Sequence, residues 1–144
     1  MSKITRFHET GGPDVLRLED TEVGEPGPGQ VRLKQSAVGL NFADTYFRTG
    51  LYPAPLPSGM GCEAAGTVTA VGPDVTHVKL GDRVTYTGAH NTLGAYATER
   101  LIAASVLIPL PDAIDFETAA AITMRGLTAA YLMRRIWTFQ DGDT

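Results

Sequence analysis

The spacing of hydrophobic residues predicts short strands over most of the chain. Residues 3–9 and 15–20 have the pattern of two strands joined by a Gly-Gly-Pro-Asp turn at 11–14. Between residues 31 and 38, apolar and charged residues alternate, as expected for a half-buried strand. Glycine-containing turns separate four more expected strands, at residues 67–71, 83–86, 94–100 and 106–109.

Two stretches break this strand pattern early in the chain. Within residues 41–49 the aromatic residues recur at helical spacing, which predicts a helix with Asn41 as N-cap and Gly50 at its C-terminal end. Residues 52–57 contain three prolines, which exclude both a regular helix and a central strand because proline lacks the amide donor.

The composition changes after residue 111. Asp115 is expected to cap a helix that includes the alanines at 119–121 and continues through residues 127–137. We therefore expect a mainly β domain at 1–112 and a helical segment at 113–144.

Charge and composition exclude several classes of function. The net charge is −4, with acidic and basic residues interspersed and without a basic run, so nucleic acid is not expected as a partner. There is no apolar stretch long enough to cross a membrane and no secretory signal pattern, so no membrane association is predicted and the expected location is cytoplasmic. The polar turn at 140–144 follows an apolar helix directly, so we expect the chain to be truncated.

One glycine motif resembles a dinucleotide-binding fingerprint. Residues 59–64 match G-x-G-x-x-A, but that motif needs a preceding buried strand and a following helix. Here a proline-rich loop precedes it and an expected strand follows it. We therefore reject the motif as a cofactor anchor.

The single cysteine, Cys62, is a conceivable metal ligand or nucleophile. Glu63, His77 and His90 are the other conceivable zinc ligands, but their spacing does not match known zinc sites, and surface histidines are the simpler interpretation. Cys62 has no activating base nearby in sequence, so a small buried side chain is expected rather than a nucleophile.

The expected helix after residue 41 carries the more informative candidates. Asp44 and Arg48 are four residues apart and can pair on one face. Tyr46 and Tyr52 flank the proline-rich loop, where they suit an aromatic pocket edge. Taken by itself, Tyr46 fits the core as well as a site, and Asn41 is most simply a helix N-cap.

Six segments together resemble the quinone oxidoreductase (zeta-crystallin-like) branch of the medium-chain dehydrogenase/reductases. They cover nearly the whole chain in order: GLNFADTY (39–46), RTGLYP (48–53), PSGMGCEAAG (57–66), GDRV (81–84), LGAYA (93–97) and GLTAAY (126–131). The resemblance implies a chaperonin-10 (GroES)-like, partly open β-barrel domain. It also implies a Rossmann domain beyond this chain and a homodimer in the full-length protein.

The resemblance implies NADPH-dependent reduction of quinones without zinc. Zinc-dependent relatives have a cysteine at the position of Asn41 and a histidine at that of Cys62, so both ligands are replaced here. By resemblance the catalytic residues are Asn41, Tyr46 and Tyr52, and there are no metal ligands. The implied cofactor-binding residues are Asn41, Phe42, Asp44, Thr45, Tyr46 and Thr128, with the phosphate anchor outside this chain.

Two other functions remain open. One is NADPH-dependent reduction of activated carbon–carbon double bonds, as in alkenal or enoyl reductases. The other is a non-catalytic binding module, since one fold hosts unrelated roles. The chain alone is expected to be inactive, because it lacks the pyrophosphate-binding glycines.

Overall fold

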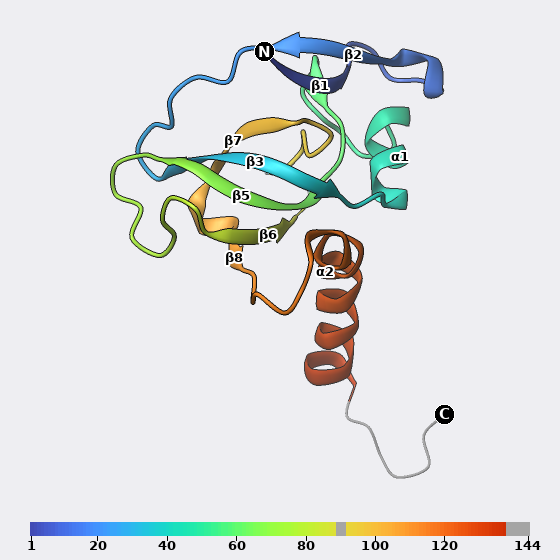
Figure 1. The fold of residues 1–144 in the computed structure, drawn as a ribbon. Helices are drawn as coiled ribbons and strands as arrows, with labels where there is room; N and C mark the ends of the chain where they lie inside the picture. Colours follow the sequence, from blue (N-terminus) through green and yellow to red (C-terminus); the bar gives the residue numbers. More distant parts are fainter. Residues whose placement is uncertain (89–91, 138–144) are drawn as a thin grey trace.

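Two antiparallel sheets make up most of the molecule (Figure 1), a computed structural model that describes residues 1–88 and 92–137. The smaller sheet has the strand order β2 (Leu16–Thr21), β1 (Ser2–Phe7), β4 (Ser58–Gly59). The larger sheet has the order β7 (Glu99–Ala103), β3 (Gln30–Val38), β5 (Glu63–Val71), β6 (Arg83–Thr87), β8 (Ile108–Pro109). Every pairing is antiparallel.

The sheets are joined by the segment that precedes β7. Ile4 of β1 forms a bridge with Ala97, and the Thr5 amide donates to the Tyr96 carbonyl at 2.7 Å. Both sheets remain open rather than closing into a continuous barrel. The expected fold class, mainly β with a GroES-like, partly open barrel and a C-terminal helix, is confirmed.

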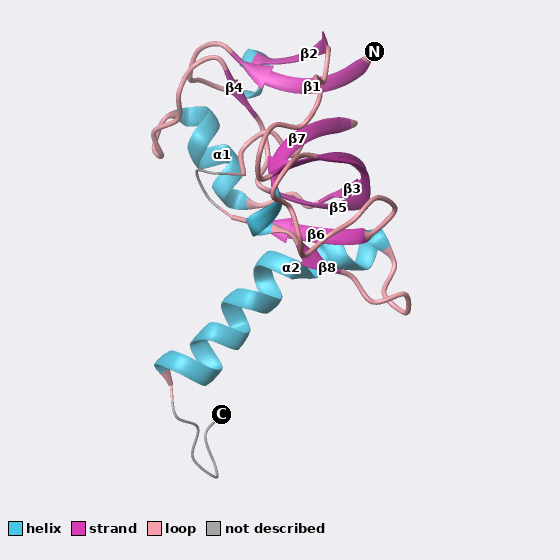
Figure 2. Ribbon diagram, turned by 90° about the vertical axis from the view of Figure 1, so that its left-hand side faces the viewer, coloured by secondary structure: helices cyan, strands magenta, loops and turns pink. Residues whose placement is uncertain are grey.

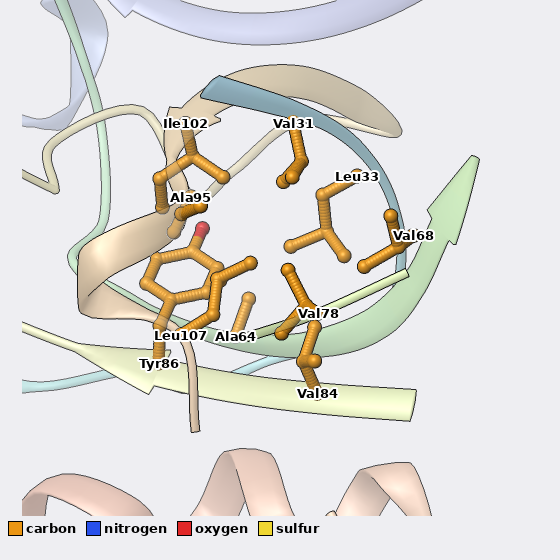
Figure 3. Close-up of a cluster of buried hydrophobic side chains, with 11 residues drawn as sticks. Val31, Leu33, Ala64, Val68, Val78, Val84, Tyr86, Ala95, Ile102 and Leu107 are labelled. Atoms are coloured by element: carbon orange, nitrogen blue, oxygen red, sulfur yellow. The ribbon is translucent and has the colours of Figure 1, made fainter. Parts of the chain in front are cut away.

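The main core lies inside the larger sheet (Figure 3). Val31 and Leu33 of β3 both point inward, because strand residues two apart share a face. Tyr86 is the largest fully buried side chain, and its hydroxyl donates to Gln35. The other members of the cluster are Ala64, Val68, Val78, Val84, Ala95, Ile102, Ala104 and Leu107.

The first helix, α1 (Phe42–Thr49), has the predicted boundaries. Asn41 is its N-cap, and Gly50 takes the left-handed conformation at φ 84° that ends the helix. Phe47 faces inward and packs with Phe7 and Met60 beneath the smaller sheet. Two short 3₁₀ helices, η1 (Pro13–Val15) and η2 (Ala104–Val106), precede β2 and β8.

The second helix, α2 (Phe116–Tyr131), begins at the predicted cap, where Asp115 accepts the Thr118 amide at 2.6 Å. Ala119 and Ala120 are buried against Ala65 of β5. Figures 1 and 2 show that α2 changes direction beside the larger sheet and then extends away from it. It continues as a π-helical segment, Leu132–Ile136. Within the described ranges, no helix has the length and apolarity needed to cross a membrane.

Three of the expected strands needed correction. The strand expected at 94–100 is wrong over most of its length, since β7 begins only at Glu99. Gly94 has a φ of 103°, and its amide and that of Ala95 both donate to Gly61, so this segment crosses between the sheets. The strand expected at 67–71 begins earlier, at Glu63, and only the end of 106–109 is strand.

Candidate active site

Asn41 lies where β3 ends and α1 begins. Its side chain is 6% exposed, and Nδ2 donates to Oε2 of Glu63 at 2.7 Å. A carboxylate oxygen only accepts hydrogen bonds, so the NH2 end of the Asn41 amide is the end that faces Glu63. The amide is therefore anchored in one orientation.

Glu63 is the first residue of β5 and is fully buried. Its second oxygen, Oε1, accepts the backbone amide of Met124 at 2.6 Å, inside α2. In a regular helix that amide would donate to Ala120. A side chain that enters the helix ladder is a known cause of a change in helix direction, so we attribute the bend of α2 to this contact.

Gly39 allows these groups to meet. A Cβ atom at this position would lie 2.4 Å from the Ala120 carbonyl oxygen and 2.5 Å from Glu63 Oε2. Both distances are far below van der Waals contact, and one of the neighbours is backbone. Only glycine therefore lets α2 and the Glu63 carboxylate approach the end of β3 this closely.

Asp44, on the first turn of α1, is also buried and accepts three hydrogen bonds. Oδ2 accepts the Asn41 amide and the Tyr96 hydroxyl, each at 2.9 Å, and Oδ1 accepts the Cys62 thiol at 3.4 Å. Burial, and then the nearby Asp44 charge, raise the pKa of Cys62 to about 12. The same two causes raise the pKa of Tyr96 above its ordinary value. Both donors therefore keep their protons at neutral pH.

An open cavity of about 160 Å³ lies beside Asn41. Its walls combine apolar side chains with an amide, a hydroxyl and a guanidinium: Leu40, Asn41, Phe42, Thr45 and Arg125. Arg125 reaches it from α2 and donates to the backbone carbonyls of Leu40 at 3.0 Å and Ala121 at 2.7 Å. The cavity is therefore formed between the start of α1 and the bent part of α2.

Two tyrosines lie at the other end of α1. The rings of Tyr46 and Tyr52 meet edge to face with centroids 5.3 Å apart, and Tyr52 also contacts Phe47 at 5.4 Å. Tyr46 is 37% exposed and Tyr52 is 42% exposed, whereas Phe47 is buried. The pair thus forms a partly exposed aromatic edge, and Tyr46 is not a core residue.

A larger cavity of about 280 Å³ lies between α2 and strands β6 and β8. Its walls carry no charged side chain, and the hydroxyls of Thr85 and Thr123 bond each other at 2.9 Å. Because the Asn41 cavity combines an amide, a hydroxyl, a guanidinium and apolar surface, we take it as the candidate site.

Comparison with known proteins identifies the family. Residues 27–112 match the family model described as the alcohol dehydrogenase GroES-like domain. The chain belongs to this family. The match spans the larger sheet, β4 and α1, whereas β1, β2 and α2 lie outside it.

Individual relatives extend over the whole chain. It is 52% identical to a quinone oxidoreductase of Pseudomonas aeruginosa, across 100% of this chain and 44% of the relative. It is 43% identical to a 2-haloacrylate reductase of a Burkholderia species, across 95% of this chain and 42% of the relative. A crystal structure of Escherichia coli quinone oxidoreductase complexed with NADPH superimposes with a TM-score of 0.91 at 45% identity, covering 96% of this chain and 42% of that one.

The chain thus spans less than half the length of these relatives. The resemblance to the quinone oxidoreductase branch, inferred from sequence motifs, is confirmed.

Several predicted site residues of this GroES-like chain lie together. Asn41, Phe42 and Thr45 line one cavity, and Tyr46 lies on the same helix. Asp44 lies behind Asn41 with its carboxylate engaged, so it supports the site from within. Thr128 lies on α2 outside the cavity lining, and its hydroxyl donates to the Met124 carbonyl at 2.8 Å.

The expected pairing of Asp44 with Arg48 is wrong. Asp44 faces Tyr96 and Cys62 in the interior, while Arg48 Nε donates to the Gly11 carbonyl at 3.2 Å. Helical spacing permits the pair, but the buried acceptor sites of Asp44 are already taken.

The glycine motif at 59–64 does not form a dinucleotide-binding turn, and the conceivable zinc ligands within residues 1–88 and 92–137 are not clustered. Residues 59–64 lead into β5 rather than into a helix, as the rejection required. Cys62 is buried, and His77 is exposed with its ring against the Ala104 carbonyl, whereas His90 lies outside the described residues. Among the residues that the structure does describe, no three His, Cys, Asp or Glu side chains gather in a way that suits a metal ion.

Three residues of the site escaped the sequence interpretation. From the sequence, Glu63 is a conceivable zinc ligand and Tyr96 is part of a family motif, but neither of these nor Arg125 is expected at the site. Their partners are far along the chain: Glu63 and Met124 are 61 residues apart, and Tyr96 and Asp44 are 52 apart. No local spacing carries such contacts.

Proposed function

We propose that the full-length protein containing this chain reduces quinones with hydride from NADPH and without zinc. The chain would provide the acceptor side of the active site. The similarity to quinone oxidoreductases, one of them solved with NADPH, supports this assignment. Because the chain covers 44% of one such relative and 42% of the solved structure, the activity is assigned to the full-length protein.

The observation that carries the proposal is the buried Asn41 amide, anchored by Glu63 at the wall of an open cavity. The residues present fit the flat reactive ring of NADPH. Leu40 and Phe42 offer apolar surface to such a ring, while Asn41 and Thr45 offer hydrogen-bonding groups. When bound, the cofactor supplies the hydride.

The proposed roles divide between the cavity and the aromatic edge. Asn41, Phe42, Thr45 and Tyr46 would hold the reactive ring, with Thr128 as a further contact from α2. Tyr46 and Tyr52 would position the flat acceptor, since aromatic rings pack well against a quinone. Hydride addition leaves a delocalised quinol anion, and water would supply its proton.

The donor set near Asn41 supports chemistry without zinc. A cysteine binds zinc as the thiolate, but the Cys62 thiol is buried and donates to Asp44. One N–H of the Asn41 amide donates to Glu63. A quinone accepts hydride without a Lewis acid, because its reduced form is stabilised by delocalisation.

A second candidate is reduction of an activated, anionic alkene. Arg125 places a guanidinium in the wall of the cavity, and arginine is well suited to bind a carboxylate. The similarity to a 2-haloacrylate reductase points to the same class of substrate.

NADPH oxidation by the full-length protein tests these assignments. We expect faster turnover with 1,4-benzoquinone than with 2-alkenals or 2-haloacrylates, and no stoichiometric zinc by metal analysis. Preference for an alkene would support the second candidate instead. Absence of turnover with every acceptor would favour a non-catalytic module, and stoichiometric zinc would overturn the metal-free chemistry.

A matched pair of variants tests the site itself. Asn41→Ala removes the anchored amide and should lower kcat/KM at least about tenfold. Asp14→Asn alters an exposed residue of η1 on another part of the molecule and should leave turnover unchanged. Equal activity of both variants would remove Asn41 from the proposed site.

A further inference from the structure

We propose that Glu63 is a positioning residue for the reaction, acting through Asn41 and through the bend in α2. The inference rests on the proposed function for its kinetic consequence. The structural part of the inference, in which one buried carboxylate holds both walls of the cavity in place, does not depend on the proposed function.

Glu63 selects the orientation of the Asn41 amide. An asparagine side chain has an NH2 end and an oxygen end of nearly equal shape, so packing alone does not distinguish them. The fully buried Glu63 carboxylate does, because it accepts from Nδ2 at 2.7 Å and would repel the oxygen end. The second N–H of the amide remains for another partner.

Glu63 also fixes the opposite wall. Its Oε1 accepts the Met124 amide at 2.6 Å, and the next residue, Arg125, lines the cavity from α2. Arg125 in turn donates to the Leu40 carbonyl, next to Asn41. Hydrogen bonds therefore link Asn41 to Glu63, Glu63 to α2, and α2 back to Leu40, the residue before Asn41.

The neighbouring backbone is adapted to this carboxylate. The Gly39 amide donates to the Glu63 carbonyl at 2.9 Å, and the missing Cβ of Gly39 leaves room for Oε2. Both oxygens of the carboxylate accept hydrogen bonds from N–H donors. A substitution that removes one acceptor oxygen from Glu63 therefore tests this role.

Glu63→Gln is the sharpest test, since it keeps the shape and removes one acceptor. A glutamine oxygen can serve either Met124 or Asn41, and if it serves Met124 its NH2 group faces Asn41 and forces that amide to invert. We expect kcat with 1,4-benzoquinone to fall at least about tenfold in the full-length protein. Glu63→Asp, too short to span both partners, should not restore it.

Thr85→Val provides the matched control. The buried Thr85 hydroxyl also links the barrel to α2, through Thr123, but it does not contact Asn41. We expect thermal stability to fall in Thr85→Val while kcat stays within about twofold. A comparable kcat loss in Thr85→Val would show that any loosening of α2 suffices, and would overturn the positioning role.

A double-mutant cycle shows whether Glu63 acts through Asn41. If it does, Glu63→Gln should lower kcat less in an Asn41→Ala background than in the otherwise unchanged protein, and the loss that remains reports the route through α2. Fully additive losses would overturn the proposal.

A spectroscopic readout separates this inference from the proposed function. In ¹⁵N-labelled full-length protein, the Asn41 side-chain amide peaks, assigned by their loss in Asn41→Ala, should shift in Glu63→Gln together with the Met124 amide. Thr85→Val should leave the Asn41 peaks in place. These shifts are expected even if quinones are not the substrate, and unchanged Asn41 peaks in Glu63→Gln would overturn the orienting role.

Discussion

The thiol of Cys62 donates to Oδ1 of Asp44 at 3.4 Å, and both side chains lie inside the protein. The same carboxylate accepts the Tyr96 hydroxyl and the backbone amide of Asn41. One aspartate therefore connects the start of α1 to the segment before β5 and to the segment that joins the two sheets.

Cys62 is expected to be inert to thiol reagents in the folded chain. It is the single cysteine, so a labelling assay reports on it alone. Its raised pKa of about 12 leaves almost no thiolate at neutral pH, and burial blocks access. A colorimetric thiol reagent should react only after denaturant is added, whereas rapid labelling without denaturant would contradict the buried Cys62–Asp44 contact.

Alkaline pH should destabilise the fold through the same group. The folded state raises the pKa of Cys62 from 9.0 to about 12, so its contribution is complete below about pH 9 and is lost as pH rises toward 12. The loss is at most about 1.4 kcal/mol per pH unit for one group. Urea unfolding over this range measures it, and Cys62→Ala should flatten the dependence. If the free energy of unfolding of Cys62→Ala depends on pH as steeply as before, another group causes the loss.

Asp44→Asn should destabilise the protein strongly without changing its shape. The amide can replace only one of the two acceptor oxygens, so a buried donor loses its partner. We expect a loss of about 2–4 kcal/mol in the free energy of unfolding, measured with urea. Asp14→Asn, an exposed control, should change it by less than about 0.5 kcal/mol. Equal values for the two variants would contradict the buried network.

Two glycine substitutions should have opposite effects. A Cβ at Gly39 would meet the Ala120 carbonyl oxygen at 2.4 Å, so Gly39→Ala should cost at least about 2 kcal/mol and displace α2. A Cβ at Gly126, on α2, would meet nothing within 4 Å, so Gly126→Ala should be neutral or add up to about 1 kcal/mol of helix stability. Thermal unfolding of both variants checks this, and a stable Gly39→Ala would show that the contact is not close.

Arg125→Gln should separate the two candidate substrates. Its guanidinium is the charged group in the cavity wall, so its loss should weaken anionic acceptors most. We expect kcat/KM of the full-length protein for 2-haloacrylate to fall about tenfold more than for neutral 1,4-benzoquinone. Because both substrates are measured on one variant, a general loosening of Leu40 affects both. Equal losses would mean that the guanidinium does not contact the acceptor.

Local signals in the sequence predicted the elements with strong end residues. Gly50 ends α1 because glycine readily takes the left-handed conformation, and Asp115 begins α2 because a carboxylate caps free helix amides. The strand expected at 94–100 is not continuous, because residues 96–97 pair with β1 of the smaller sheet and β7, from Glu99, pairs with β3 of the larger sheet. The expected Asp44–Arg48 pair failed because spacing along a helix carries no information on burial.

By itself, the sequence determined the mainly β architecture and the positions of both helices, because these features depend on periodicity and capping within a few residues. The group Asn41, Phe42, Thr45 and Tyr46 followed from the family resemblance of its motifs. Only the tertiary structure decided how that group is held. Glu63 meets Asn41 across 22 residues and Met124 across 61, and this pairing exists because Gly39 lets a helix from the far end of the chain approach the end of β3. Such contacts arise from close packing of distant segments, which no local pattern encodes.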